Sequence, residues 1–245
     1  VGTFMSGGID SSTMSAIAAQ LKPGIKAFTL GYNEEASELD EVQQAQDTAA
    51  LHSMEHIIER VEPESCLHNL GAWVEGYEEP YYSLAPNHVI SELASENDVT
   101  VVLNGLGGDE LLAGYGYYRY HWLPRMPLLH PLVSGFRDSQ LEKSKLVRGL
   151  ALMGAKSADR VHTMLFMHTG DDELRRLFVP DFVPEMSTPD ILHQLYADDV
   201  EFTDNVEAMS YMDLMNYVGN HHVHRVDQFT MAFSLEGRFP FLDHE

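Results

Sequence analysis

The stretch V-G-T-F-M-S-G-G-I-D-S-S, Val1 to Ser12, decides which fold the sequence predicts. Its first five residues form a short apolar run, which is typical of a buried strand, and Ser-Gly-Gly then indicates a tight turn. Met14, Ile17, Ala18 and Leu21 follow at the spacing of one helix face, so a helix is expected to pack by these side chains and to end at Gly24. A strand, a glycine-rich turn and a helix in this order are typical of an α/β sheet.

The same alternation continues through the first half of the chain. Further strands are expected at residues 25–32, 53–61 and 99–103, and helices between them at 37–49, 63–75 and 87–96. From about Leu106 onward the periodicity is helical and no further strand is expected. The predicted fold class is therefore α/β, a parallel sheet with helices on both faces, followed by a mostly helical C-terminal part, with residues 1–122 and 123–245 as the two regions of one domain.

Composition excludes several classes of function. Fifteen Lys and Arg stand against 38 Asp and Glu, a formal net charge of -23, so a large nucleic-acid footprint is not expected. No apolar run approaches the roughly 20 residues of a membrane-spanning helix. The single cysteine, Cys66, excludes an internal disulfide and a multi-cysteine metal site. A chain that starts at Val1 without a leader is interpreted as a cytoplasmic piece of a longer protein.

Charge is unevenly distributed along the sequence. Residues 119–176 carry ten Lys or Arg against six acids, whereas residues 177–224 carry nine acids and no Lys or Arg. Solvated helix faces explain such runs in the simplest way. The alternative is that the basic stretch lies near an anionic ligand or a partner domain.

The first glycine-rich turn, Ser6 to Ser12, predicts a phosphate site. Gly7 and Gly8 let the backbone approach a ligand closely, and the N–H groups that open the next helix attract negative charge. The hydroxyls of Ser6, Ser11 and Ser12 are expected to point to the same place. Asp10 fits such a loop if a divalent cation bridges its carboxylate to phosphate oxygens. The alternative is a Gly-Gly turn in which Asp and Ser only cap a helix.

A second turn of this kind, L-N-G-L-G-G-D-E, occupies Leu103 to Glu110 directly after the apolar strand at 99–103. Ligands of open parallel sheets bind outside the carboxyl ends of the strands, so the two turns are expected to flank one site. Asp109 would then supply a second carboxylate for the cation. Asp109 and Glu110 could equally cap the next helix.

These motifs resemble a known family. The Ser6–Ser12 stretch resembles the pyrophosphate loop of the ATP-pyrophosphatase superfamily, whose fold is of the adenine nucleotide α-hydrolase type. The string R-V-D-Q-F-T-M-A-F-S-L-E-G-R-F-P-F-L-D-H-E at Arg225 to Glu245 resembles the synthetase domain of glutamine-dependent asparagine synthetases. So do E-E-P at Glu78 to Pro80 and the Val101 to Tyr115 segment. The similarity spans the whole chain and is weakest between about Pro124 and Asp199.

The resemblance implies a reaction and a set of site residues. Aspartate would be adenylated on its side-chain carboxylate by Mg-ATP, and ammonia from glutamine would convert the β-aspartyl-AMP to asparagine. Nucleotide would be bound by Met5, Ser6, Gly7, Gly8, Asp10, Ser11, Ser12, Leu30, Asn104 and Gly105. Asp10 and Asp109 would bind magnesium. Arg238 would counter anionic charge, although a purely structural ion pair would explain it as well. The implied partners are the small-molecule substrates, a glutaminase domain and a second copy in a homodimer, with neither nucleic acid nor membrane.

Three departures from the family pattern keep alternatives open. The glutaminase domain is not in this sequence, the synthetase lysine of the family falls beyond Glu245, and Leu106 stands where asparagine synthetases carry Glu. The 245-residue chain alone is therefore expected to be inactive. Leu106 favours a related amide-forming enzyme acting on another carboxylate, of the β-lactam synthetase or peptide-cyclising kind. A nucleotide-binding module without catalysis is the remaining alternative.

Overall fold

The computed structural model describes residues 1–32, 40–61, 70–77, 86–125, 152, 157–166 and 171–243. These residues divide into two compact units, Val1–Gly108 with Gly219–Glu245, and Asp109–Val218. No helix within the described ranges is long and apolar enough to cross a membrane.

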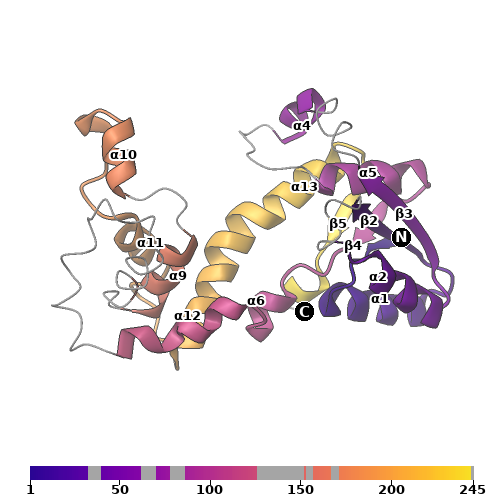
Figure 1. Ribbon diagram of the computed structural model, residues 1–245, viewed down its shortest axis with the longest axis horizontal. Helices are drawn as coiled ribbons and strands as arrows, with labels where there is room; N and C mark the ends of the chain where they lie inside the picture. The colour runs from indigo at the N-terminus through magenta and orange to yellow at the C-terminus, as the bar shows by residue number, and fades with distance from the viewer. Residues whose placement is uncertain are drawn as a thin grey trace. The chain divides into compact units, whose positions relative to one another are not determined.

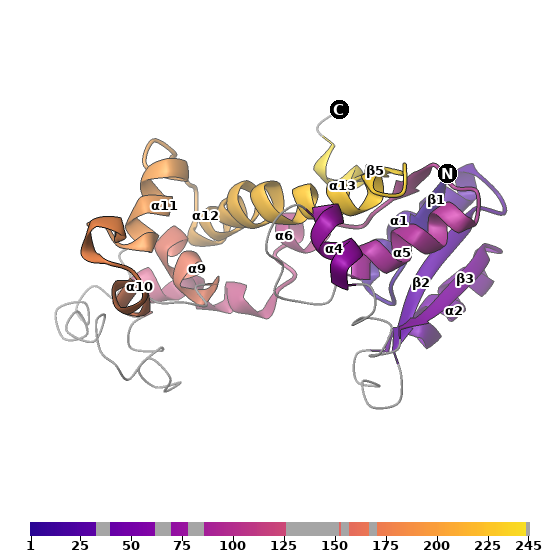
Figure 2. The same ribbon diagram turned by 90° about the horizontal axis from the view of Figure 1, so that it is seen from above.

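The first unit contains a five-stranded, all-parallel sheet (Figures 1 and 2). Its strands, in the order β3-β2-β1-β4-β5, are β3 (Glu55–Val61), β2 (Lys26–Tyr32), β1 (Gly2–Phe4), β4 (Val101–Leu103) and β5 (Glu236–Arg238). The predicted α/β class is confirmed. The prediction of no strand after Leu106 was wrong, because Glu236–Arg238 pairs with Val101–Leu103 at the sheet edge. Three residues, of which Glu236 and Arg238 are exposed, leave no apolar alternation to detect.

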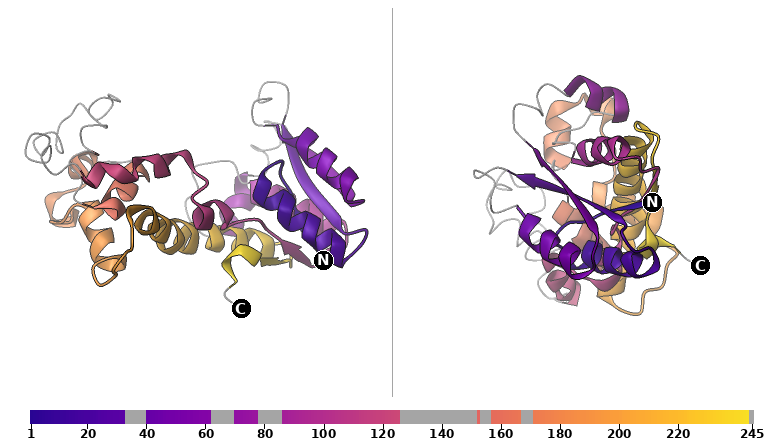
Figure 3. Two further views of the ribbon diagram at one scale, coloured as in Figure 1. Left: turned by 90° about the horizontal axis from the view of Figure 1, so that it is seen from below. Right: turned by 90° about the vertical axis from the view of Figure 1, so that its right-hand side faces the viewer.

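Helices cover both faces of this sheet. The helices α1 (Ile9–Leu21) and α2 (Val42–Leu51) pack on one face (Figure 3). On the other side of the sheet lie α5 (Pro86–Glu96) and α13 (His224–Met231), and α4 (Leu70–Tyr77) packs on α13. The main core forms where α5 meets the central strands, and its buried residues are Phe4, Phe28, Ile90, Ala94, Val99, Val102 and Leu235.

The buried face of α1 differs from the prediction. Met14 and Ala18 are buried as expected, but Ile17 is 54% exposed and Leu21 is 84% exposed. Ser15 and Ala19 take their place in the interface. Small side chains let the helix lie close to the sheet, so its large apolar side chains are the ones left outside.

The second unit is helical. It contains α9 (Ala158–Phe166), α10 (Asp171–Leu177), α11 (Thr188–Tyr196) and α12 (Asn205–Met212), together with a 3₁₀ segment at Gly116–Arg125. A π-helical segment, Asp213–Val223, continues α12. The core of the second unit contains Tyr118, Ala158, Ala208 and Met209. The predicted, mostly helical part after the α/β region is therefore confirmed.

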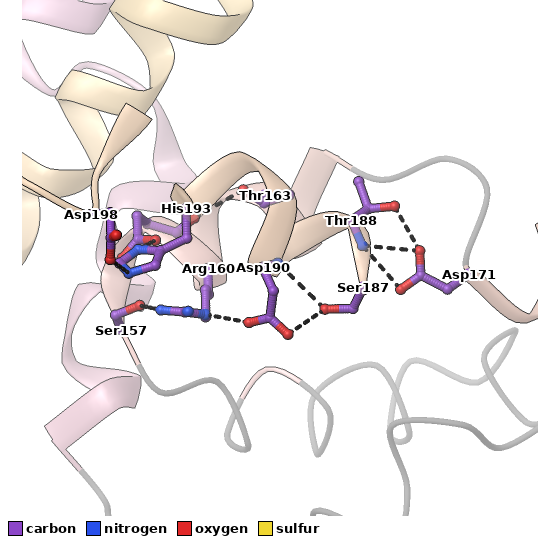
Figure 4. A network of polar contacts seen from close by, with 10 residues as sticks. Ser157, Arg160, Thr163, Asp171, Ser187, Thr188, Asp190, His193 and Asp198 are labelled. Carbon is purple, nitrogen blue, oxygen red and sulfur yellow. Dashed lines mark hydrogen bonds and ion pairs between the residues drawn. The ribbon is translucent and has the colours of Figure 1, made fainter. Parts of the chain in front are cut away.

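Within the second unit, polar contacts hold α9 and α11 together (Figure 4). Arg160 of α9 pairs with Asp190 of α11 at 2.8 Å (Nε to Oδ1), and the Ser187 hydroxyl caps α11. His193 Nδ1 lies 2.7 Å from the buried Asp159 carboxylate. Within this unit the Arg160 side chain therefore joins α9 to α11 through an ion pair and is not solvated, since it is 15% exposed.

Candidate functional site

The two glycine-rich turns follow adjacent strands at the centre of the sheet. β1 leads into Ser6–Gly8 and α1, and its neighbour β4 leads into Asn104–Gly108. The strand order reverses between β1 and β4, because β2 and β3 lie to one side and β5 to the other. Such a switch point, outside the carboxyl ends of parallel strands, is where ligands bind in open α/β sheets.

The hydroxyls of the first turn bind the turn's own backbone. Ser11 Oγ lies 2.9 Å from Ser6 Oγ and accepts from the Ser6 N–H at 3.1 Å. Ser6 Oγ accepts from the Gly8 N–H at 3.1 Å, and the Ser12 hydroxyl donates to the Ser6 carbonyl at 3.2 Å. The structure thus brings Ser6, Ser11 and Ser12 together, as predicted, in a loop whose shape is held by these contacts.

Gly7 packs directly on the start of α2. A Cβ atom on Gly7 would lie 2.8 Å from both Glu41 Cβ and Gln44 Cβ, so this position has no room for a side chain. The Gly7 N–H donates to Glu41 Oε2 at 3.1 Å. Glu41 is a residue of the site that the sequence analysis missed. Its position next to Asp40, in the first turns of the helix predicted at 37–49, was the available signal.

The second turn touches the first at two glycines. A Cβ atom on Gly105 would lie 2.8 Å from the Ser11 nitrogen and 2.9 Å from Ser11 Cα. A Cβ atom on Gly108 would overlap the carboxylate of Asp10, with Oδ1 at 2.8 Å. At Gly105 the close approach is of backbone to backbone, which needs glycine, whereas at Gly108 the neighbour is the Asp10 side chain. Both contacts show that the two turns lie against each other.

The C-terminal string reaches the same edge of the sheet. Gly107 adopts a φ of +101°, and a Cβ atom there would lie 2.8 Å from Leu242 Cγ. The Asn104 N–H donates to the Arg238 carbonyl at 2.8 Å, and Asn104 Oδ1 accepts from the Leu106 N–H at 3.0 Å. The Arg238 side chain, 61% exposed, pairs with Glu236. An exposed pair of this kind is weak, so Arg238 is available to a ligand at small cost.

Met5, directly after β1, and Leu30 of the neighbouring β2 belong to different clusters. Met5 is buried with Ala27, Ala45 and Ala49 on the α2 side. Leu30 packs on the cluster around Phe28 on the opposite face. The structure therefore does not bring the two predicted adenine contacts into one patch.

A buried polar contact supports the first turn from below. The Thr29 hydroxyl donates to the Met5 carbonyl at 2.6 Å and lies 2.8 Å from His56 Nε2. Because the single hydroxyl proton goes to the carbonyl, His56 Nε2 is the donor in the second contact. Burial lowers the pKa of His56, which keeps the ring neutral. The sequence analysis missed both residues; in the sheet Thr29 follows Phe28, the partner of Phe4, and His56 pairs with Ala27 on the next strand.

Asp109 opens the second unit, where its surroundings hold it firmly. The Gly114 N–H donates to the Asp109 carbonyl at 2.8 Å, and a Cβ atom on Gly114 would overlap the Asp109 carboxylate. The next residue, Glu110, is 1% exposed, and its carboxylate accepts from the Tyr115 hydroxyl at 2.9 Å. Burial raises the pKa of Glu110, and the Tyr115 hydrogen bond opposes that rise.

A fully buried carboxylate, that of Asp213, accepts further hydrogen bonds in this part of the second unit. Asp213 accepts from the Tyr117 and Tyr118 hydroxyls, each at 2.6 Å, and lies 2.5 Å from His162 Nε2. The Ser210 hydroxyl of α12 donates to the Glu110 carbonyl at 2.6 Å. The tyrosines after the second turn are therefore packing and hydrogen-bonding residues of the second unit.

The arrangement fits an anion and, beside it, a cation. Backbone N–H groups and the start of a 13-residue helix attract phosphate oxygens. Within the described ranges no group of three or more His, Cys, Asp or Glu could hold a metal alone. Asp10 fits Mg²⁺ nonetheless, because this ion usually takes one or two carboxylates with substrate phosphates and waters. The sharing of one ion by Asp10 and Asp109 stays a prediction, and Glu78–Pro80 and Cys66 lie outside the described residues.

Comparison with known proteins agrees with this geometry. The family model described as asparagine synthase matches residues 1–245. "Asparagine synthetase [glutamine-hydrolyzing] 1" of Bacillus subtilis is 28% identical over 255 residues, covering 99% of this chain and 39% of the relative. A "putative asparagine synthetase [glutamine-hydrolyzing]" of Mycobacterium bovis is 31% identical over 261 residues, covering 100% of this chain and 38% of the relative.

A third relative, "putative asparagine synthetase [glutamine-hydrolyzing] 2" of Methanocaldococcus jannaschii, is 30% identical over 159 residues, or 62% of this chain and 29% of the relative. The chain thus spans about two fifths of the length of the bacterial relatives that it matches throughout. With two glycine-rich turns at a sheet switch point and a family match along its whole length, the chain belongs to the asparagine synthase family.

Proposed function

We propose that this chain carries the synthetase site of an ATP-dependent ligase that amidates a carboxylate, with aspartate as the first candidate and ammonia from glutamine as the nitrogen donor. One observation carries the proposal: at the switch point, Gly105 lies against Ser11 and Gly108 against Asp10. This contact brings together two turns that are about a hundred residues apart in sequence, and it supports the proposal that the edge they form binds phosphate.

The proposed reaction has two steps. A carboxylate oxygen of the substrate attacks the α-phosphorus of ATP, and pyrophosphate leaves. Ammonia then attacks the carbonyl carbon of the acyl-AMP, and AMP leaves with that carboxylate oxygen as the amide forms. Little covalent work falls to the protein in such a sequence, so alignment of the reactants and stabilisation of charge dominate.

Each part of the site has a role in this proposal. The N–H groups of Gly7 and Gly8 and the hydroxyls of Ser6, Ser11 and Ser12 bind the departing pyrophosphate. Asp10 and Asp109 hold magnesium, which supplies positive charge to the phosphate oxygens. Asn104 and Gly105 contact the nucleotide through the backbone, and Arg238 offers a cation. Leu30, which is half-buried on β2, remains a candidate contact for the adenine, whereas Met5 is 1% exposed and packs in the core instead.

A second candidate rests on Leu106. This side chain stands between Gly105, which contacts Ser11, and Gly107, which contacts Leu242. An apolar residue in the turn where asparagine synthetases carry Glu favours a less polar carboxylate substrate. The alternative is a related amide-forming enzyme of the β-lactam synthetase or peptide-cyclising kind.

Substrate-dependent exchange of labelled pyrophosphate into ATP separates these possibilities. The full-length protein would be assayed with magnesium and, in parallel, with aspartate, glutamate and larger carboxylates. Exchange that requires aspartate supports asparagine formation, and exchange that requires another carboxylate supports the second candidate. ATP binding without exchange for any carboxylate would contradict a catalytic role.

A further inference from the structure

The carboxylate of Glu41 takes a hydrogen-bond donor that the proposed function assigns to phosphate. The Gly7 N–H donates to Glu41 Oε2 at 3.1 Å. Gly7 is one of the two glycines of the S-G-G turn, and its amide belongs to the set that cradles an anion. A phosphate oxygen on this amide and the Glu41 carboxylate on the same amide exclude each other.

The backbone of Glu41 is fixed beside the turn, but its side chain is not. A Cβ atom on Gly7 would lie 2.9 Å from the Glu41 carbonyl oxygen, so the first turn of α2 and the loop are in contact. That carbonyl accepts from the Ala45 N–H at 3.1 Å, which ties it into the helix. Glu41 is exposed, so its carboxylate can rotate into solvent without moving α2.

The neighbouring carboxylate is compensated, and Glu41 is not. Asp40 Oδ2 pairs with Arg60 at 3.4 Å, and Asp40 Oδ1 caps α2 through the Val42 N–H. Across the described ranges, no Lys or Arg forms an ion pair with Glu41. The negative charge of Glu41 therefore repels an anion bound at the turn.

We propose that Glu41 is a built-in competitor for the phosphates: it holds the Gly7 amide, is displaced when nucleotide binds, and returns to the amide as pyrophosphate leaves. This inference rests on the proposed function and adds a positioning residue to it. The competition weakens binding of ATP and of pyrophosphate alike, and it speeds release of the pyrophosphate product.

Glu41→Gln tests this directly, because the amide keeps the size and removes the charge. The matched control is Asp47→Asn, which removes one exposed charge from the same helix, where Asp47 contacts Gln43. Binding of Mg-ATP and of magnesium pyrophosphate to the full-length protein would be measured by calorimetry. For an exposed charged contact we expect Glu41→Gln to lower both Kd values about two- to fivefold, with Asp47→Asn unchanged.

Rates provide a second readout. In single-turnover experiments Glu41→Gln is expected to slow pyrophosphate release. In steady-state experiments kcat and KM for ATP should then both fall. Glu41→Ala, which removes the acceptor altogether, should tighten binding at least as much. Unchanged or weaker binding in both Glu41 variants, or equal tightening in Asp47→Asn, would overturn the inference. Failure of the parent protein to bind ATP would instead overturn the proposed function.

Discussion

Gly105→Ala tests whether the two turns must touch. The added Cβ atom would lie 2.8 Å from the Ser11 nitrogen and 2.9 Å from Ser11 Cα, whereas ordinary contacts begin at 3.4 Å. The turns must therefore separate by about 0.6 Å, the difference between 3.4 Å and 2.8 Å. Both contact atoms belong to the backbone at the start of α1, so no side-chain rotation can relieve the overlap.

Two consequences of different size are expected. Overpacking of this kind costs about 1–3 kcal/mol of stability, and each kcal/mol lowers Tm by about 2–4 °C in a chain of this size. A displacement approaching 1 Å at a reacting centre can cost on the order of 10²-fold in rate. We therefore expect a modest fall in Tm and a loss of pyrophosphate exchange of at least about tenfold in Gly105→Ala.

Gly71→Ala provides the control. Gly71 lies in α4, and a Cβ atom there would meet nothing within 4 Å. The same change of one methyl group should leave exchange unaltered and raise stability by about 0.4–1 kcal/mol. Circular dichroism would follow unfolding, and labelled pyrophosphate would follow exchange. If Gly105→Ala matched the parent in both measurements, close contact between the turns would have no part in activity.

Four further predictions concern the metal, the support of the loop, the pH dependence of stability and the buried carboxylate. Asp10→Asn and Asp109→Asn each remove a carboxylate ligand, so each should raise the magnesium concentration for half-maximal exchange at least about tenfold with little change in Tm. Parental magnesium dependence in either variant would refute the assignment of that residue as a magnesium ligand. Thr29→Val should cost about 1–3 kcal/mol because it leaves a buried carbonyl unpaired, and a loss under about 0.5 kcal/mol in urea unfolding would contradict it. The lowered pKa of His56 predicts that stability falls as pH drops below the ordinary value of 6.5, where the unfolded chain binds the extra proton; His56→Gln should flatten that slope, and an unchanged slope would exclude this histidine as its source. Asp213→Asn should cost about 2–3 kcal/mol, because three donors face its buried carboxylate; a Tm equal to that of the parent would show the contacts to be unimportant.

The central features of the fold follow from local sequence. The order strand, turn, helix around Ser6–Gly8 and the apolar run before Asn104 place the two turns at strand ends. Because ligand sites of open parallel sheets lie at the carboxyl ends of the strands, the two turns are then expected to lie together. That reasoning needs only residue type and spacing. It located Asp10 and Ser11 in the turn that Gly105 and Gly108 contact.

Tertiary contacts set the features that local sequence left out. The three-residue strand Glu236–Arg238 exists because its backbone pairs with β4, and its side chains carry no strand pattern. Glu41 reaches Gly7 only through the packing of α2 on the loop. Ile17 and Leu21 follow the helical period and are still exposed, because the contact of α1 with the sheet favours small side chains.

The fate of one oxygen atom tests the central claim most directly. Aspartate labelled with ¹⁸O in its side-chain carboxylate would be incubated with the full-length protein, Mg-ATP and ammonia. Mass spectrometry would then measure the ¹⁸O content of AMP and of pyrophosphate. Attack of the carboxylate on the α-phosphorus, followed by amide formation, predicts one ¹⁸O in AMP and none in pyrophosphate. Label in pyrophosphate or inorganic phosphate, or AMP formed without label, would contradict an acyl-AMP route.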